Sequence, residues 1–465
     1  MNDQYFINFS IRMIKLKANF LLAFNQPKQA KKILENALGN YPKNMYLLST
    51  LQVAYRANGN WNAFFETYDL VVSLEPNNLT TRINFSVALM YVSNYRYAIT
   101  QLRYCLDHWT FSDFNSNYLA NAKALLGICY IYVQELELAE SSLTEAQKLN
   151  PWNPDVVFGL LLYFRATGCV HEIPEFLERK INIYPKIYAF YYWRAFITRY
   201  YLYDLTESIK WYKLAIDMID ANRFRKYFRI YYSTKNEAIP EYILREYIQA
   251  LVSLGNTKQV AAAIIWNKIK FPDNSLDTTI LQIVFEISTG ELKKAEKQCL
   301  RKLSNNLAGD SLAEYWSLLA IIQTKQKKFD DGINSINQCL SIAPYFSIFW
   351  KILGFLQIEK REWQNAINTF SKIIELDCLD SDAWEDLGRC QVNIGNLEAA
   401  SSAYQRTVFI DPFDALAWID LGIIYYQLGE HVLSYSACER GLSYNRVSGE
   451  REQLALSIIK NRLSR

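Results

Sequence analysis

The side chains that most often carry chemistry are few in this sequence and far apart. Only three histidines occur among the 465 residues, His108, His171 and His431. The sequence has no HExxH pair for zinc, no GxSxG nucleophile turn and no glycine-rich phosphate loop. We therefore expect a protein that is not an enzyme and that holds neither a metal nor another cofactor.

The cysteines give no metal or redox motif either. No two of the eight lie within three residues of one another, so a CxxC pair is excluded. Most of them sit in apolar helical patterns, which predicts buried free thiols in a reducing compartment. Arg12, Lys15 and Lys17 interrupt the only segment that could be a signal peptide. No uncharged apolar run reaches the roughly 18–20 residues of a membrane span, so we expect a soluble, cytoplasmic protein.

Charge is balanced over the whole chain but not along it. Lys and Arg total 50 and Asp and Glu total 47, for a net charge of +3. Residues 176–235 hold 12 basic and 5 acidic side chains, whereas residues 372–430 hold 3 basic and 11 acidic ones. The near-zero sum therefore hides a basic middle and an acidic C-terminal region.

The elements that must position these residues repeat with a period of 34. The period is marked by a tryptophan ladder, followed in most units by a leucine three residues on and a glycine next to it. An i, i+3, i+4 spacing places the three side chains on one face of a helix, where the glycine lets a second helix approach closely. The ladder and its companions are Trp316, Trp350, Trp384, Trp418, Leu353, Leu387, Leu421, Gly354, Gly388 and Gly422, with Gly127 at the glycine position of an earlier unit.

This pattern of Trp, Leu-Gly, Ala and a terminal Pro resembles the tetratricopeptide repeat. The resemblance implies an all-α, right-handed solenoid (superhelix) of about twelve helical hairpins. The organisation that we predict has six parts: an N-terminal extension (1–10), an N-terminal array of about six repeats (11–220) with a short insertion at 111–119, a basic aromatic insertion (221–243), degenerate repeats (244–312), four regular repeats (313–448) and a capping helix (449–465).

In tetratricopeptide solenoids the first helix of each unit lines the concave face at its second, fifth, ninth and twelfth positions. In the third to sixth units these positions are mostly apolar, and an exposed apolar strip usually marks an interaction site. We expect this groove to bind a partner segment, unless superhelical curvature or the 221–243 insertion covers it. Its predicted lining is Ile83, Val87, Met90, Asn121, Ile128, Ile131, Phe158, Leu162, Arg165, Phe190, Trp193, Ile197 and Tyr200.

A basic aromatic patch is the second candidate surface. Cations interleaved with aromatic rings can neutralise phosphates and stack bases, but they can equally meet an acidic peptide or simply form a solvated helix face. The patch is predicted to comprise Arg194, Arg199, Arg223, Arg225, Lys226 and Arg229.

The resemblance implies a non-enzymatic scaffold or adaptor that holds partner polypeptides on its concave face. One alternative is a subunit of a larger assembly that self-associates through a solenoid end, which would make it a homo-oligomer. The other is an RNA-binding helical-repeat protein that uses residues 176–235. We expect other proteins or peptide segments as partners, and nucleic acid less than these.

Overall fold

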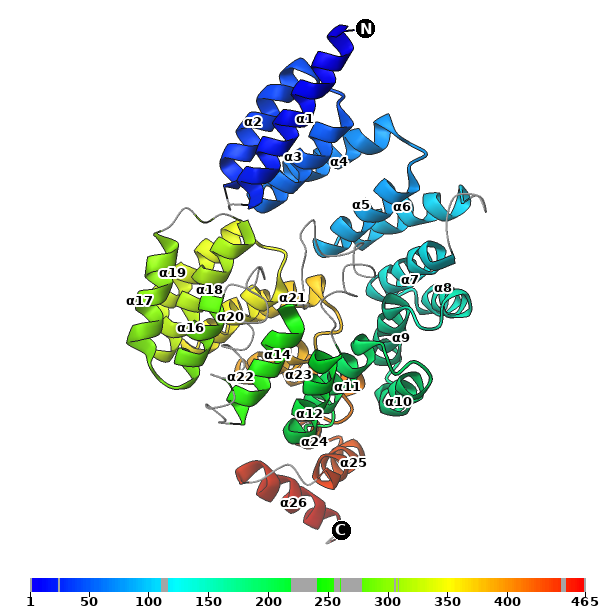
Figure 1. Cartoon of the computed structure of the whole chain (residues 1–465). Helices are drawn as coiled ribbons and strands as arrows, with labels where there is room; N and C mark the ends of the chain where they lie inside the picture. Colours follow the sequence, from blue (N-terminus) through cyan, green and yellow to red (C-terminus); the bar gives the residue numbers. More distant parts are fainter. Residues whose placement is uncertain are drawn as a thin grey trace.

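The fold was analysed in a computed structural model that describes residues 2–23, 26–109, 116–218, 241–254, 260, 278–304, 307, 309–444 and 449–463. Every regular element among these residues is a helix. Most helices pair into antiparallel hairpins that stack on one another, and Figure 1 shows them following one another around a curved path. The expected all-α repeat solenoid is confirmed.

The helices fall into two arms joined by a middle segment. The N-terminal arm comprises α1 (Asn2–Ala23), α2 (Pro27–Asn40), α3 (Met45–Ala57), α4 (Trp61–Leu74), α5 (Leu79–Tyr91), α6 (Tyr95–Asp107), α7 (Ser116–Tyr132), α8 (Leu136–Leu149), α9 (Pro154–Ala166), the 3₁₀ turn η1 (Val170–Glu172), α10 (Ile173–Ile183), α11 (Tyr188–Tyr200) and α12 (Leu205–Asp217). The middle segment contains α14 (Glu241–Ser253), α16 (Thr278–Ser288) and α17 (Leu292–Leu303). The C-terminal arm comprises α18 (Gly309–Lys325), α19 (Phe329–Ile342), α20 (Ser347–Glu359), α21 (Trp363–Leu376), α22 (Ser381–Asn393), α23 (Leu397–Ile410), α24 (Ala415–Gln427), α25 (His431–Ser443) and α26 (Glu450–Leu463).

Two helices begin inside segments that we expected to lie outside the repeats. Helix α1 begins at Asn2, within the predicted extension 1–10, and α7 begins at Ser116, within the predicted insertion 111–119. Of the basic aromatic insertion, only residues 241–243 are among the described residues, at the start of α14. The last helix, α26, occupies most of the predicted cap.

The ladder glycines lie where two helices of a hairpin come closest. A Cβ added at Gly354 would lie 2.6 Å from Cζ of Phe370, and one at Gly388 would lie 2.7 Å from Cδ2 of Tyr404. At Gly422 it would meet Sγ of Cys438 at 2.5 Å. Such contacts are shorter than van der Waals separation, so only a glycine allows the second helix to pack at this depth. Gly127 follows the same rule, against Leu143.

Three of the ladder tryptophans donate a hydrogen bond to the turn that joins one hairpin to the next. The indole Nε1 of Trp350 donates to the Pro344 carbonyl at 2.8 Å, that of Trp384 to Cys378 at 3.1 Å and that of Trp418 to Pro412 at 2.9 Å. In each case the acceptor precedes the tryptophan by six residues. The 34-residue spacing of Trp therefore sets the shape of successive inter-unit turns as well as filling space between helices.

The two arms lie against each other along a seam. Turns inside N-terminal hairpins meet turns between C-terminal hairpins, and the contacting residues are 208 to 283 positions apart in hydrogen-bonded pairs. That separation equals about six to eight 34-residue units, so one stretch of the solenoid folds back onto an earlier one. Figure 1 shows α20 to α24 lying beside the curve formed by α5 to α12.

Candidate partner-binding surfaces

Five contacts between the arms mark successive points along the seam. It starts with ring contacts from Trp61 to Tyr345 (5.9 Å between centroids) and from Tyr91 to Phe346 (5.1 Å). Farther along, Ser93 Oγ donates to the Leu376 carbonyl at 3.2 Å. The remaining contacts join Arg165 Nη2 to the Leu379 carbonyl at 2.8 Å and Tyr203 OH to Asp411 Oδ2 at 3.0 Å.

The turn 377–380, between α21 and α22, places a buried side chain against the N-terminal arm. Leu379 is 4% exposed and belongs to the same apolar cluster as Leu162 and Ala166 of α9. Burial raises the pKa of the Asp377 carboxyl, and the nearby Arg165 guanidinium opposes that rise. Arg165 is therefore a cation held between the arms by a carbonyl and a partly buried carboxylate.

Much of the predicted groove is buried. Seven of its thirteen lining residues are less than 9% exposed, so the described chain does not present the open apolar strip that we expected over α5 to α11. Ile128 packs where α7 meets Gly159 of α9, and Phe158 stacks on Trp193 at 4.9 Å between ring centroids. The buried residues are Ile83, Asn121, Ile128, Ile131, Leu162, Phe190 and Ile197. Val87, Met90, Phe158, Arg165 and Trp193 are partly exposed, and Tyr200 is exposed. A binding role for these residues stays a prediction.

Some of the equivalent positions of the C-terminal arm carry exposed apolar side chains. Counting from the start of each hairpin, the second and ninth positions of α20, the twelfth of α22 and the second of α24 are apolar and exposed. We call these four residues the C-terminal strip: Ile348 (56% exposed), Phe355 (47%), Val392 (37%) and Leu416 (39%). The predicted groove ended at α11, although the same 34-residue count reaches these positions.

Ion pairs link two helices of the C-terminal strip, α20 and α22. Lys351 of α20 bridges to Asp380 at 2.8 Å and to Asp382 of α22 at 3.0 Å. Burial and the neighbouring carboxylates of Asp414 and Asp386 raise the pKa of Glu385 to about 7.

Acidic groups outnumber basic ones around the C-terminal strip. Beside Glu385, burial raises the pKa of Asp420 to about 6, and Arg451 opposes that rise. Six carboxyl groups influence one another here, against three cations: Asp380, Asp382, Glu385, Asp386, Asp414 and Asp420, with Lys351, Arg389 and Arg451. The strip is therefore apolar with an acidic border.

The described part of the basic aromatic patch is engaged within the chain. Arg199 Nη1 donates to Oε2 of Glu246 at 2.9 Å and to its carbonyl at 3.0 Å, and Tyr200 OH donates to the same carboxylate. The Arg194 guanidinium lies over the Trp211 ring at 5.8 Å. The other predicted members, Arg223, Arg225, Lys226 and Arg229, lie outside the described residues. Arg199 is thus occupied in joining α11 to α14, which does not favour phosphate binding.

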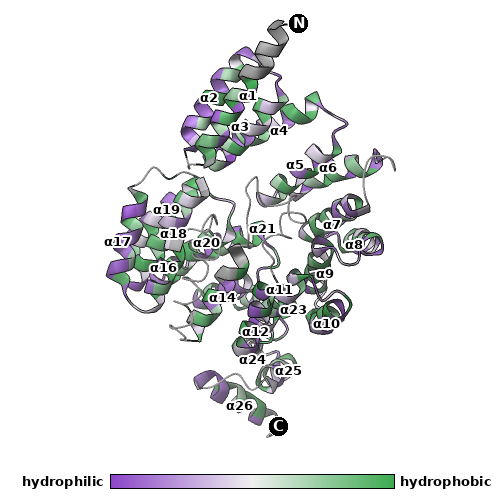
Figure 2. Ribbon diagram, viewed as in Figure 1, coloured by the Kyte–Doolittle hydropathy of each residue, from purple (hydrophilic) through white to green (hydrophobic). Residues whose placement is uncertain are grey.

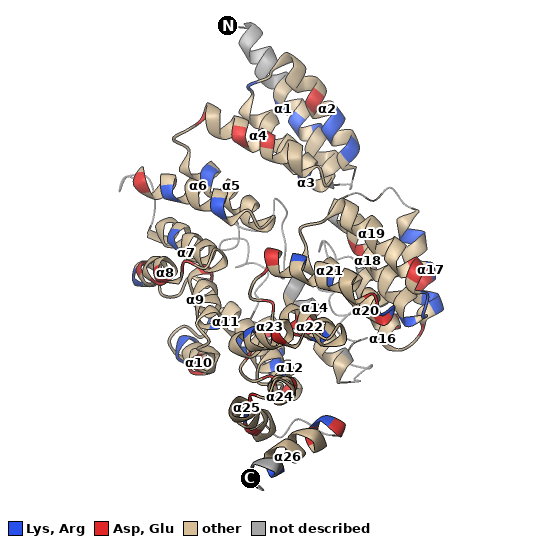
Figure 3. Cartoon of the chain, turned by 180° about the vertical axis from the view of Figure 1, so that it is seen from behind, with Lys and Arg blue, Asp and Glu red and all other residues tan. Residues whose placement is uncertain are grey.

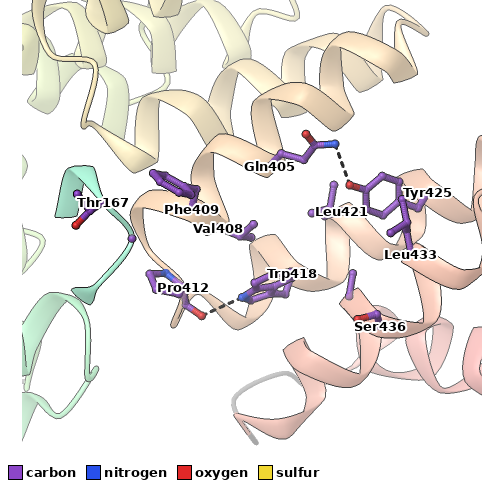
Figure 4. A pocket seen from close by; sticks show the side chains of 12 residues that line it. Thr167, Gln405, Val408, Phe409, Pro412, Trp418, Leu421, Tyr425, Leu433 and Ser436 are labelled. Atoms are coloured by element: carbon purple, nitrogen blue, oxygen red, sulfur yellow. Dashed lines mark hydrogen bonds between the residues drawn. The ribbon is translucent and has the colours of Figure 1, made fainter. Parts of the chain in front are cut away.

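A pocket of about 430 Å³ opens where the seam meets the last hairpins. Thr167 and Gly168 of the N-terminal arm form one end, opposite Phe409 (Figure 4). Its wall is mostly apolar and aromatic, and Gln405 Nε2 donates to Tyr425 OH at 2.8 Å. The remaining lining residues are Val408, Pro412, Trp418, Leu421, Leu433, Ser436 and Ala437.

Groups with metal or nucleophilic chemistry are dispersed. Within the described ranges, no three His, Cys, Asp or Glu side chains gather as a metal site. All eight cysteines are unpaired and six are buried, and burial raises the pKa of Cys390 and of Cys438 to about 11. No helix in the described part of the chain is long and apolar enough to cross a membrane.

Comparison with known proteins agrees with the repeat geometry. The family model described as the tetratricopeptide repeat matches residues 356–415 and 391–442, which span α21 to α24 and parts of their neighbours. This part of the chain consists of tetratricopeptide repeats. Its regular hairpins pack through a Trp, Leu and small-residue core, as the resemblance implied, and proteins of this family generally act by binding other proteins. No curated protein matched the sequence.

Several solved structures are similar to part of this tetratricopeptide solenoid. MamA is 21% identical with a TM-score of 0.32, over 34% of this chain and 92% of MamA. MamA from Desulfovibrio magneticus RS-1 is 15% identical with a TM-score of 0.33, over 36% and 93%. YrrB, described as a tetratricopeptide protein with an unusual peptide-binding site, is 17% identical with a TM-score of 0.33, over 43% and 98%.

Proposed function

We propose that the chain is a non-enzymatic scaffold that holds a segment of a partner polypeptide on the concave face of its C-terminal arm. The observation that carries this proposal is the exposure of Ile348, Phe355, Val392 and Leu416 at the concave positions of three consecutive hairpins. Exposed apolar groups that gather on one face of a solenoid are suited to docking a partner segment.

The border of the C-terminal strip indicates the chemistry of the partner segment. Asp382, with a side chain 76% exposed, and Glu385 lie between the apolar residues of α20 and those of α22 and α24. A segment with alternating apolar and Lys or Arg side chains would bury its apolar groups and pair its cations with these carboxylates.

The closed seam supports a binding mode in which the scaffold is preformed. The contacts along the seam hold the C-terminal arm against the N-terminal arm, so that little of the solenoid needs ordering when the partner binds. The entropic cost of ordering then falls mainly on the partner segment. This arrangement suits an adaptor that captures extended peptides.

The proposal is tested by selecting binders from a random 12-residue peptide library with the full chain as bait. We expect enriched peptides to combine apolar residues with Lys or Arg. Phe355→Glu should weaken their binding at least tenfold, because loss of a central aromatic contact costs about 2 kcal/mol or more.

Val432→Glu is the matched control. Val432 is 80% exposed on α25, and its substitution introduces the same charge outside the C-terminal strip. Enriched peptides that bind Phe355→Glu as tightly as the unmodified chain would rule out the C-terminal strip as their site.

A further inference from the structure

The outer face of α1 carries a second apolar surface, at the opposite end of the molecule from α26. Met13, Leu16 and Phe20 are 50%, 66% and 61% exposed. Their spacing of three and four residues places them on one ridge of the helix, about 10 Å long. We call these three residues the α1 ridge.

The side chains of the α1 ridge do not belong to the apolar cluster that packs the first hairpins. Helix α1 already buries its other face, where Ile11 and Ala18 join a cluster with Leu34 of α2 and Leu47 of α3. At the other end of the chain, α26 covers the last hairpin with the buried side chains of Ala455 and Ile458. The two ends therefore differ, and the described residues leave the ridge exposed at the first one.

Basic side chains border the α1 ridge on both sides. With about 100° per residue, Arg12 lies about 40° to one side of Leu16 and Lys17 about 100° to the other. Lys15 lies over the ring of Tyr46 of α3, 5.1 Å from its centroid, and Tyr46 is 67% exposed.

Cations also dominate the whole N-terminal end. Residues 11–46 contain seven Lys and Arg but a single acidic residue, Glu35. Lys and Arg are coloured blue on α1 and α2 in Figure 3, and Figure 2 shows that the described part of α1 mixes hydrophobic and hydrophilic residues along its length.

We propose that the α1 ridge docks an amphipathic helix of a partner protein whose apolar seam is flanked by Asp and Glu. A narrow ridge with charges on each side has the form of a helix-pairing seam, in which flanking charges choose the partner. A second copy of this chain would oppose Arg12 and Lys17 with the same cations, and like charges at such a seam are unfavourable. This surface is separate from the C-terminal strip.

The size of the α1 ridge favours a partner helix over a membrane as its occupant. Three apolar side chains over two helical turns match one face of a single helix, whereas binding in a lipid interface requires a broad apolar face along a helix. The other face of the part of α1 whose side chains are described, residues 11–23, is already packed against α2 and α3, so within that part the narrow ridge remains for docking.

The test uses three synthetic helical peptides and the full chain. Each peptide has three heptads with Leu at the seam, flanked by Glu in the first and by Lys in the second, and the third is a scrambled version of the first. Fluorescence anisotropy should show that the Glu peptide binds at least tenfold more tightly than the Lys peptide, with an affinity that falls as salt increases. Arg12→Glu combined with Lys17→Glu should invert this preference, and Leu16→Asp should abolish binding.

Controls keep the outcome specific to the α1 ridge. Circular dichroism and melting curves of each variant report folding, and the charge-inverting double variant tests the idea even if Leu16→Asp unfolds. Phe355→Glu should bind the Glu peptide as the unmodified chain does, so the two proposed surfaces succeed or fail separately.

Three results would overturn the inference. One is equal affinity for the Glu and Lys peptides. Another is binding to vesicles of anionic phospholipid that Leu16→Asp removes, without affinity for the Glu peptide. The last is a dimer in light scattering that the same substitution converts to a monomer.

Discussion

Arg165 is a cation within the seam between the two arms, and its replacement should loosen the seam around residues 377–380. Arg165 Nη2 donates to the Leu379 carbonyl at 2.8 Å, and its positive charge offsets the raised pKa of the Asp377 carboxyl. Arg165→Met keeps an unbranched aliphatic side chain at this position while it removes the charge and the donor. The Leu379 carbonyl then loses the Arg165 donor, and the Asp377 carboxyl loses one of the two cations that lower its pKa.

The size of this effect follows from those two losses. A hydrogen bond from a charged donor contributes about 1.5–3 kcal/mol, and the attraction between the Arg165 charge and the Asp377 carboxyl adds to this loss. Lys351 also lowers the pKa of Asp377 and can take over part of the role. We therefore expect the seam to lose about 2–4 kcal/mol.

Hydrogen exchange followed by mass spectrometry measures this loss where it occurs. At tenfold per 1.4 kcal/mol, amides of residues 377–380 should exchange about 30- to 700-fold faster in Arg165→Met. Lys210→Met, which removes an exposed ion pair with Glu207 on α12, should leave these amides unchanged. Unaltered exchange at 377–380 in Arg165→Met would refute the assignment of Arg165 as a cation that stabilises this part of the seam.

Three further substitutions test other parts of the account. Gly388→Leu should lower the melting temperature, because an added Cβ would lie 2.7 Å from the Tyr404 ring and overpacking costs about 1–3 kcal/mol. Gly39→Ala is the control and should not lower it, because a Cβ added at Gly39 would have no neighbouring atom within 4 Å. Trp384→Phe should speed exchange at residues 377–380 by about fivefold, because the indole hydrogen bond to the Cys378 carbonyl is worth about 1 kcal/mol. Burial raises the pKa of Asp411 from 3.8 to about 7, so the folded state retains its proton longer than the unfolded chain and stability falls as pH rises toward 7. Melting temperatures should therefore be lower at pH 8 than at pH 6, and Asp411→Asn should reduce that difference; an undiminished difference would exclude Asp411 as its source.

Local repetition made the fold predictable. Helices α20, α22 and α24 begin at 347, 381 and 415, three residues before Trp350, Trp384 and Trp418, so each start can be counted from the tryptophan ladder. The pattern is informative because each hairpin packs mainly on its neighbours, so the residues that specify a unit lie within that unit.

The candidate surfaces were less predictable because they depend on distant parts of the chain. Ser93 meets Leu376 and Arg165 meets Leu379 only after the solenoid has folded back onto an earlier stretch. The small twist between hairpins that brings them together accumulates over about six to eight units, and no short motif records it. Apolar residues at equivalent positions thus become buried in one arm, as at Leu162, and stay exposed in the other, as at Phe355.

The choice between the two concave faces can be measured directly by photo-crosslinking. A benzophenone amino acid at position 355 reports on the C-terminal strip, and the same group at position 158 reports on the predicted groove of the N-terminal arm. With peptides enriched on the unmodified full chain, we predict crosslinks from position 355 and none from position 158. Crosslinks from position 158 without any from position 355 would contradict the account.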